Sequence, residues 1–372
     1  MQKLAQSWLV FELTNSAWAL ALDAFLGEIP IFLLSLIGGV VADRMDRRKL
    51  LLASQIVQLS CALTLAGLLA AGVVAVWHVY LLSFIVGCAQ AFGGPAYQSI
   101  IPSLVPKDGL QNAIALNSIQ FNLARVIGPA LGGVAMAQLG AVWCFLLNAL
   151  SFVAVIISLI RLPARLPAGV KKESPLESMK EGIAFVRSRE AMAPLIVLAF
   201  LMTFFSLPLL TFLPVIAKDV LHLGRDAYST LLSVSGIGSV SGALIVAGMS
   251  NVKRKGRTAL IMLGTFGVLM IGFSQSREFW LNCLLLYLSG AAMISVGALV
   301  MSLVQTITPD EMRGRVMSVY NVAFRGGMPF GNLVSGRLIQ SFHAPEVLAA
   351  NGALLIMLAF YFFFVQRKIV NA

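Results

Sequence analysis

Long apolar stretches alternate along this chain with short polar connections. A helix that crosses a membrane needs about 20 mostly apolar residues to span roughly 30 Å of hydrocarbon. Stretches of this kind occupy residues 17–41, 50–72, 75–98, 112–136, 139–160, 192–217, 229–249, 258–275, 279–303, 316–340 and 345–365. The strands of a transmembrane barrel would be about half as long and would alternate in polarity. The pattern therefore predicts an all-α membrane protein.

The first residues form a shorter apolar segment, Met1 to Thr14, with Lys3 inside it. This segment lacks the basic, then apolar, then small-residue order of a cleavable signal peptide. We expect it to be the outer half of helix 1, truncated at its N-terminus in this sequence. A helix lying at the membrane interface is the alternative.

Composition supports a membrane protein. Hydrophobic residues make up 59% of the 372 residues and charged residues 12%, with a mean hydropathy of +0.89. A soluble domain carries roughly 25% charged residues, so this chain has too little charge to cover a water-facing surface. The net charge of +11 does not indicate a nucleic-acid partner. Most of the 27 Lys and Arg residues fall in alternate loops, which the positive-inside rule places in the cytosol together with the C-terminus.

The chain divides at its longest interior hydrophilic stretch. We expect an N-terminal half at 1–162, a cytosolic linker at 163–191 and a C-terminal half at 192–372. Within the linker, Ser174-Pro175-Leu176-Glu177 is typical of a helix start. Apolar residues at 3/4/3 spacing follow, so an amphipathic helix on the membrane surface is predicted. Contact with a partner protein is the alternative.

The two halves share a local pattern. Arg125 stands four residues before Pro129, and Arg325 stands four residues before Pro329. In both halves a loop with Pro and an acidic residue comes before this helix. Parallel repeats of this kind occur in one class of membrane transporters. We therefore predict two pseudo-symmetric halves of six helices each.

The loop after the first long apolar stretch carries the most specific motif, Gly38-Gly39-Val40-Val41-Ala42-Asp43-Arg44-Met45-Asp46-Arg47-Arg48. It resembles the loop 2–3 signature of the major facilitator superfamily. The matching positions are Gly39, Asp43, Arg44, Arg47 and Arg48, whereas Asp46 replaces a glycine of the signature. The resemblance implies a cytosolic gate in which Asp43 binds the N-terminus of helix 11, near Arg315 to Met317. A plain basic anchor is the alternative.

A second motif lies in the predicted helix 5. The segment from Ala124 to Gly133 is similar to the drug:proton antiporter motif of the same superfamily, with matches at Gly128, Pro129, Gly132 and Gly133 and Ala124 in place of the first glycine. Gly and Pro in a membrane helix serve either as a hinge or as close packing sites. Over a wider range, AQSWLVFELTNS, SMKEGIAFVRS and TPDEMRGRVMS resemble the subgroup that includes macrolide-efflux and enterobactin-exporter-like proteins.

Charged residues inside apolar spans are the second kind of site candidate, because a charge at mid-bilayer costs roughly 2.5–3.5 kcal/mol. Glu28 and Arg325 lie near the middle of their spans and are a candidate interface pair, which protonation of Glu28 would release. A static structural pair is the alternative. Arg125 is a further candidate for coupling. Asp23 lies about 140° around the helix from Glu28, nearer the outer end, and is expected to reach lipid headgroups.

Polar residues near mid-span are candidates for lining a substrate cavity: Asn117, Gln120, Asn122 and Asn321. The sequence contains no Walker A loop. The glycines at 236, 238 and 242 lie inside an apolar span, where small residues let helices touch. The Cys and His residues are too scattered to predict a metal site. We expect no cofactor, with a proton gradient as the energy source.

The prediction for function is proton-coupled efflux of a small amphipathic, drug-like compound by alternating access, at the bacterial inner membrane and without enzymatic activity. A siderophore or lipid exporter, an importer, and a non-transporting sensor on the same fold are the alternatives. A membrane-bound enzyme ranks last. The expected partners are a small-molecule substrate and the bilayer, with no nucleic acid, and the protein is expected to be monomeric.

Overall fold

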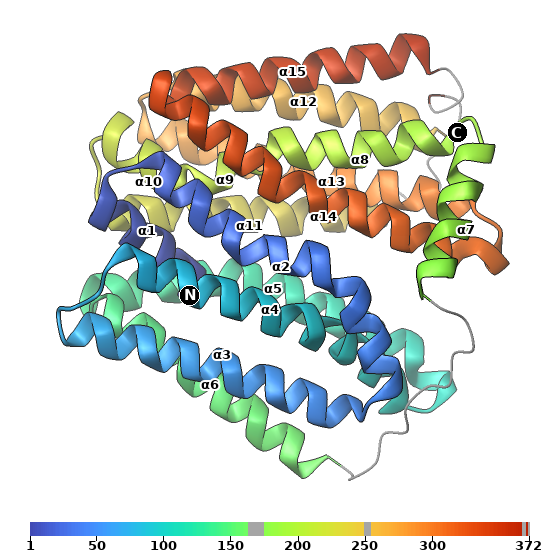
Figure 1. Cartoon of the computed structure of the whole chain (residues 1–372). Coiled ribbons are helices and arrows are strands. Elements are labelled where there is room, and N and C mark those ends of the chain that lie inside the picture. Colours follow the sequence, from blue (N-terminus) through green and yellow to red (C-terminus); the bar gives the residue numbers. More distant parts are fainter. Residues whose placement is uncertain (163–174, 249–253, 367–369, 371–372) are drawn as a thin grey trace. The chain divides into compact units, whose positions relative to one another are not determined.

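The computed structural model describes residues 1–162, 175–248, 254–366 and 370. It divides into an N-terminal unit, Met1–Pro175, and a C-terminal unit, Leu176–Ala372. Helices make up both units (Figure 1). The division falls inside the predicted linker, whose own bounds stay a prediction because much of that segment lies outside the described residues.

The N-terminal unit is built from helices that run along one another (Figure 1). Its elements are α1 (Gln2–Thr14), α2 (Ala17–Arg44), α3 (Arg47–Ala70), α4 (Val76–Ile100), the short turns η1 (Ile101–Ser103) and η2 (Lys107–Gly109), α5 (Leu110–Gln138) and α6 (Ala141–Arg161). Asn15 ends α1 with a left-handed φ of 46°, and Ser16 N-caps α2 by accepting a bond from the Ala19 N–H. Asn tolerates the left-handed conformation and Ser is a favoured N-cap, so the residue types at these two positions favour the tight turn.

The C-terminal unit repeats this arrangement after one additional helix. Its elements are α7 (Pro175–Ser188), α8 (Met192–Ser206), α9 (Pro208–Thr211), α10 (Leu213–Val215), the π-helical turn η3 (Ile216–Val220), α11 (Arg225–Gly248), α12 (Lys255–Gln275), α13 (Phe279–Ile307), α14 (Asp310–Ser341) and α15 (Ala344–Val365).

The pairing of helices is the same in the two units. In the N-terminal unit α2 packs on α4, α3 on α4 and α6, and α1 on α5. In the C-terminal unit α11 packs on α13, α12 on α13 and α15, and α8 on α14. Ten of the eleven predicted spans each correspond to one helix, and the predicted pseudo-symmetry of the two halves is confirmed.

Glycines allow the closest of these pairs. A Cβ added at Gly38 would collide with the backbone carbonyl of Ala91 on α4. A Cβ at Gly238 or Gly242 of α11 would collide in the same way with Tyr287 or Ala291 of α13. The glycines of α11 therefore serve helix contact, as predicted, and small residues in both units let backbones approach.

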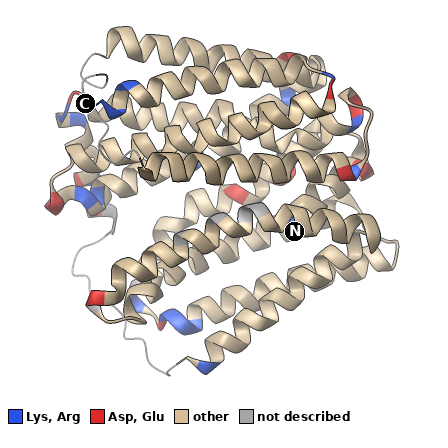
Figure 2. Cartoon of the chain, turned by 180° about the vertical axis from the view of Figure 1, so that it is seen from behind, with Lys and Arg blue, Asp and Glu red and all other residues tan. Residues whose placement is uncertain are grey.

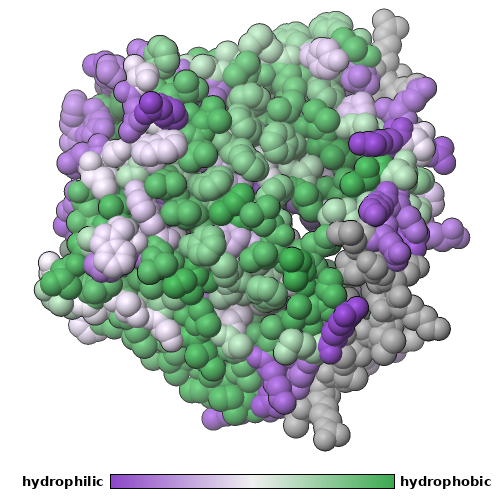
Figure 3. Space-filling view, in the orientation of Figure 1, coloured by the Kyte–Doolittle hydropathy of each residue, from purple (hydrophilic) through white to green (hydrophobic). Residues whose placement is uncertain are grey.

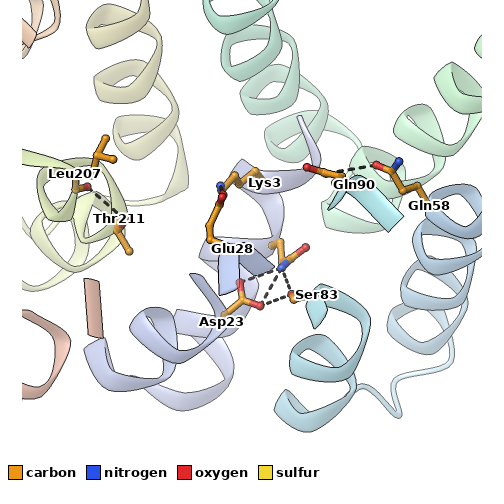
Figure 4. Close-up of polar contacts among 9 residues, drawn as sticks. Lys3, Asp23, Glu28, Gln58, Ser83, Gln90, Leu207 and Thr211 are labelled. Carbon is orange, nitrogen blue, oxygen red and sulfur yellow. Dashed lines mark hydrogen bonds and ion pairs between the residues drawn. The ribbon is translucent and has the colours of Figure 1, made fainter. Parts of the chain in front are cut away.

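The seventh span is broken, whereas the sequence pattern predicted one continuous helix over 192–217. Helix α8 ends at Ser206, and short helical pieces follow as far as Val220. Pro208 and Pro214 stand at the starts of these pieces, and proline removes an N–H and clashes with the preceding turn. Within this broken segment the Thr211 hydroxyl Oγ1 donates to the carbonyl of Leu207 at 3.4 Å (Figure 4).

The surface matches a lipid environment. Nine helices in the described part of the chain are long and apolar enough to cross a membrane. Large apolar side chains such as Leu33, Leu150 and Leu244 are more than 60% exposed, which a soluble protein avoids over a wide area. Figure 3 shows the broad apolar surface, and Figure 2 shows that charged side chains gather towards the helix ends.

The amphipathic helix predicted in the linker is α7, which begins at Pro175; Ser174 lies outside the described residues. Helix α7 contacts α14 within the C-terminal unit. Glu181 forms an ion pair of 2.5 Å with Arg315, and Gly182 lies so close to the Arg315 carbonyl that a Cβ would collide with it. This helix is therefore packed on the C-terminal unit.

Candidate functional site

A polar cluster lies among the apolar helices of the N-terminal unit, where α1, α2 and α4 meet (Figure 4). The Gln6 side-chain amide donates to both oxygens of Asp23, at 3.0 and 2.9 Å, and lies 2.7 Å from Ser83 Oγ. Ser83 Oγ donates to Asp23 Oδ1 at 2.5 Å. Asp23 is 7% exposed. The carboxylate therefore has its hydrogen bonds met inside the unit, which burial of a charge requires.

An ion pair lies beside this cluster and joins two of the same helices, α1 and α2. Lys3 Nζ of α1 is 2.9 Å from Glu28 Oε1 of α2. Side-chain exposure is 73% for Lys3 and 22% for Glu28. Lys3 and Gln6 are three residues apart and therefore lie on one face of α1. That face engages two acidic residues of α2, Glu28 through an ion pair and Asp23 through hydrogen bonds.

A second polar chain connects α3 and α4. Gln90 donates to Gln58 Oε1 at 3.4 Å (Figure 4). Gln58 in turn donates to Ser54 Oγ at 3.2 Å, and Ser54 donates to the Ala89 carbonyl at 2.7 Å. Gln58 and Ser54 are buried. These bonds fix the buried Gln58 amide and Ser54 hydroxyl against α4, as polar residues commonly do in membrane bundles.

The two acidic residues differ in what a proton would change. Asp23 accepts three hydrogen bonds from two groups, the Gln6 amide and the Ser83 hydroxyl, so protonation would disturb several bonds at once. Glu28 has Lys3 as its partner, and neutral Glu28 would lose the charge attraction that holds this pair. Glu28 is also the more accessible of the two. One ion pair thus joins Glu28 to α1, whereas several hydrogen bonds join Asp23 to α1 and α4.

The structure changes the interpretation of the predicted coupling residues. The expectation that Asp23 reaches lipid headgroups is wrong, because Gln6 and Ser83 hold its carboxylate inside the unit. Glu28 is paired with Lys3. Arg325 is exposed on α14 and has no ion-pair partner among the described residues of its own unit. Because Glu28 and Arg325 belong to different units, their pairing stays a prediction. The side chain of Arg125 lies outside the described residues.

The loop 2–3 motif makes bonds within the N-terminal unit. Arg47 Nη1 donates to the Ser99 carbonyl at 3.1 Å, near the end of α4. Arg48 Nη2 donates to the Ile160 carbonyl at 2.6 Å, near the end of α6. The last carbonyls of a helix lack partners and carry partial negative charge, so these guanidinium groups satisfy both helix ends. Arg44 is exposed, Gly39 meets no neighbour within 4 Å, and the side chain of Asp43 lies outside the described residues.

Asp46, which replaces a glycine of the signature, has a defined role. It N-caps α3, with its carboxylate accepting from the backbone N–H groups of Arg48 at 2.9 Å and Lys49 at 3.3 Å. Its φ of −62° requires no glycine. The turn between α2 and α3 is therefore formed with an aspartate cap.

The expected N-terminus of helix 11 near Arg315 to Met317 is wrong. Helix α14 begins at Asp310, so residues 315–317 lie within the helix, where backbone N–H groups bond to the preceding turn. Asp310 and Glu311 occupy the first turn themselves. A contact of Asp43 with this helix stays a prediction, but the backbone N–H groups of residues 315–317 are not free to form it.

The helix-5 motif is a packing site in this structure. Helix α5 runs through Pro129, and a Cβ added at Gly132 would lie 3.0 Å from the Cα of Met1. A Cβ added at Gly128 would lie 3.6 Å from the Met1 nitrogen. The first residue of the chain therefore rests on the motif, and Gly133 is buried. Packing is the role that these contacts support.

The predicted cavity-lining residues do not form one group. Asn117 Oδ1 accepts from the Tyr97 hydroxyl at 2.5 Å, which links α4 and α5. Gln120 on α5 and Asn321 on α14 are exposed, and the side chain of Asn122 lies outside the described residues. Their role in substrate binding stays a prediction.

Sequence reasoning missed Lys3, Gln6 and Ser83 as members of the site. Lys3 and Gln6 had a recognisable signal, because two polar residues three apart on a short apolar helix mark one face. Ser83 had none, since a serine in an apolar helix commonly bonds to its own backbone. Its contact with Asp23 appears only once α2 and α4 are packed.

Known proteins resemble the chain in both sequence and fold. The family model described as "Transmembrane secretion effector" matches residues 1–372. A protein of Citrobacter koseri named enterobactin exporter EntS is 28% identical over 333 residues, covering 88% of this chain and 78% of the relative. The protein of the same name from Shigella boydii serotype 18 is 28% identical over 331 residues, with the same coverage.

Solved transporters share the fold. A variant of the nucleoside transporter NupG superposes with a TM-score of 0.78 at 12% identity, covering 97% of this chain and 94% of that one. A peptide transporter POT in complex with alafosfalin has a TM-score of 0.76 at 11% identity, covering 99% and 92%. The chain is therefore a multi-pass membrane transporter, and it belongs to the transmembrane secretion effector family of the major facilitator superfamily.

Proposed function

We propose that this transporter exports a siderophore of the enterobactin type, driven by protons, across a bacterial inner membrane with its C-terminus in the cytosol. The observation that carries the substrate class is the similarity to proteins named enterobactin exporters over 88% of the chain. The basic loops between alternate helices support the orientation. This substrate replaces the drug-like compound that the sequence motifs first favoured.

The site geometry supports a coupling role for Glu28. Its pair with Lys3 holds α1 to α2, and uptake of a proton by Glu28 would weaken that attachment while the Asp23 bonds remain. Alternating access requires two conformations of the transporter. A helix contact whose strength changes with protonation would shift the balance between two such conformations. Arg325 and Arg125 are the further charged groups that we expect to respond to this change.

The substrate is tested by secretion. A bacterial strain lacking its own enterobactin exporter is complemented with this chain, and enterobactin in the medium is measured by mass spectrometry. We expect the chain to restore secretion and the Glu28→Gln variant, present in the membrane at equal amount, to fail. Unrestored secretion with normal amounts of wild-type protein would show that enterobactin is not the substrate.

Coupling is tested separately in proteoliposomes. An imposed pH gradient should drive uptake of the substrate into vesicles with inverted transporter, and substrate movement should in turn move protons. If substrate flux is the same with and without the gradient, proton coupling is wrong even where the substrate is right.

The helix-5 motif favours a second candidate, efflux of drug-like amphipathic compounds. The complemented strain provides the comparison, because a macrolide would accumulate less in cells that express the chain. Lowered macrolide accumulation without enterobactin secretion would select this second function.

A further inference from the structure

The C-terminal unit contains an apolar cavity between α11, α12 and α13 that the transport site does not use. Its volume is about 220 Å³, and its walls include Ile245, Met262, Leu269, Leu288 and Leu299. Three hydroxyl groups also line it, each bonded to a carbonyl of its own helix: Thr258 to Arg254, Thr265 to Ile261 and Ser295 to Ala291. The cavity therefore offers a ligand almost entirely apolar surface.

The cavity extends along half of the membrane thickness. Its lining residues on α12 run from Thr258 to Leu269, which at 1.5 Å per residue is roughly 16 Å. Half of the hydrocarbon core is about 15 Å. Thr258 lies close to Lys255, the first residue of α12, so the cavity reaches from the membrane surface to the midplane. Ile245 lines it and is 57% exposed, so the cavity is open on that side.

A positive charge lies at the surface end of this cavity. Lys255 Nζ donates to Ser302 Oγ of α13 at 3.1 Å, and thus extends from α12 across to α13. Ser302 lies three residues from Leu299, which lines the cavity. The ammonium group has three donor hydrogens and this bond uses one of them. Two donors therefore remain for an anionic group beside the opening.

Arg257 provides a contrast at the same end of α12. Its guanidinium carbon is 5.9 Å from the centre of the Phe363 ring on α15. This side chain is therefore directed towards α15, whereas the cavity lies between α12, α13 and α11. Both residues contribute the same charge near the membrane surface, but only Lys255 reaches the helix that forms the cavity wall.

We propose that this cavity binds an acyl chain of an anionic phospholipid, whose phosphate contacts Lys255. An apolar slot one leaflet long with a cation at its surface end matches the length and charge distribution of such a lipid. Basic residues next to anionic lipid contribute roughly 1 kcal/mol each, which corresponds to about a fivefold preference in binding. The site is independent of the acidic cluster in the N-terminal unit.

The proposal is tested by native mass spectrometry of the purified full chain, titrated with phosphatidylglycerol or with phosphatidylethanolamine of the same acyl chains. We expect the wild type to bind phosphatidylglycerol about fivefold more tightly. Lys255→Gln should remove this preference, and Arg257→Gln should keep it. Thr265→Phe, which fills the cavity from an exposed helix position, should reduce binding of both lipids.

Three results would overturn the proposal. One is equal binding of the two lipids by the wild type, and another is an equal loss in Arg257→Gln and Lys255→Gln. The third is unchanged lipid binding in Thr265→Phe, provided that its melting temperature shows a folded protein. If Thr265→Phe instead removes a bound detergent or a drug-like compound while lipid binding persists, the cavity belongs to that compound.

Discussion

At the scale of single residues, Asp23 and Glu28 of α2 have different roles because their partners differ. Asp23 is buried and accepts from Gln6 and Ser83, whereas Glu28 forms an ion pair with Lys3, which is 73% exposed. A buried hydrogen-bonded carboxylate stabilises the packing of three helices, while a pair open on one side contributes little to stability.

Asp23→Asn should therefore destabilise the protein and Glu28→Gln should not. The asparagine places an N–H₂ group among donors, and a buried group left without its partner costs about 1–3 kcal/mol. Thermal unfolding of the purified variants in detergent measures the difference. Equal melting temperatures for Asp23→Asn and the wild type would contradict the role of Asp23 as a structural acceptor.

Asp46 allows a second test, because its contribution is a helix cap. Asp46→Ala should lower stability by about 0.5–2 kcal/mol, while Asp46→Gly, which restores the residue of the signature, should cost only a few tenths. Chemical unfolding of both variants provides the comparison. A larger loss in the glycine variant than in the alanine variant would mean that the aspartate does more than cap α3.

At the scale of helices, close approach depends on individual glycines. Gly38 faces the Ala91 carbonyl of α4, whereas its neighbour Gly39 has no atom within 4 Å of an added Cβ. Gly38 and Gly39 are thus adjacent in one helix, but a methyl group at Gly38 would point towards α4 and one at Gly39 would not.

Gly38→Ala should separate α2 from α4 and lower stability by about 1–3 kcal/mol, the usual cost of overpacking. Gly39→Ala should leave stability unchanged or raise it slightly, since alanine favours a helix more than glycine does. Melting temperatures of the two variants measure this contrast. A similar loss in both would show that helix contact is not the cause.

The helices also show what the sequence was able to predict. The spans were recognisable because each needs a long apolar run, and a run such as 279–303 has no other explanation. Pro208 and Pro214 indicate the break after Ser206, but the uninterrupted apolar run of this segment predicts one continuous span. The hydrogen-bond partners of the charged residues could not be predicted from the sequence, because the bonds of Arg48 to Ile160 and of Ser83 to Asp23 join residues that are distant in the chain.

At the scale of the whole molecule, the distribution of basic residues predicts the orientation in the membrane. Arg47, Arg48 and Lys255 lie at helix ends, and loops of the opposite set, such as the one at Gly72, carry few positive charges. The positive-inside rule then assigns one side of the bilayer to each set of loops.

Reporter fusions test this assignment. A green fluorescent protein fused after Ala372 should fluoresce, because it folds in the cytosol, while alkaline phosphatase inserted at Gly72 should be active in the periplasm. The reversed pattern, with an active phosphatase after Ala372, would invert the orientation and with it the proposed direction of transport.

The attachment of α7 to α14 sets the length of the covalent tether between the two units. Because Glu181 and Gly182 fix α7 to the C-terminal unit, the tether is reduced to the dozen or so residues before Pro175, which reach at most roughly 40 Å. Loss of the Glu181–Arg315 pair would weaken the attachment of α7, and release of α7 would add its 14 residues to the covalent connection between the units.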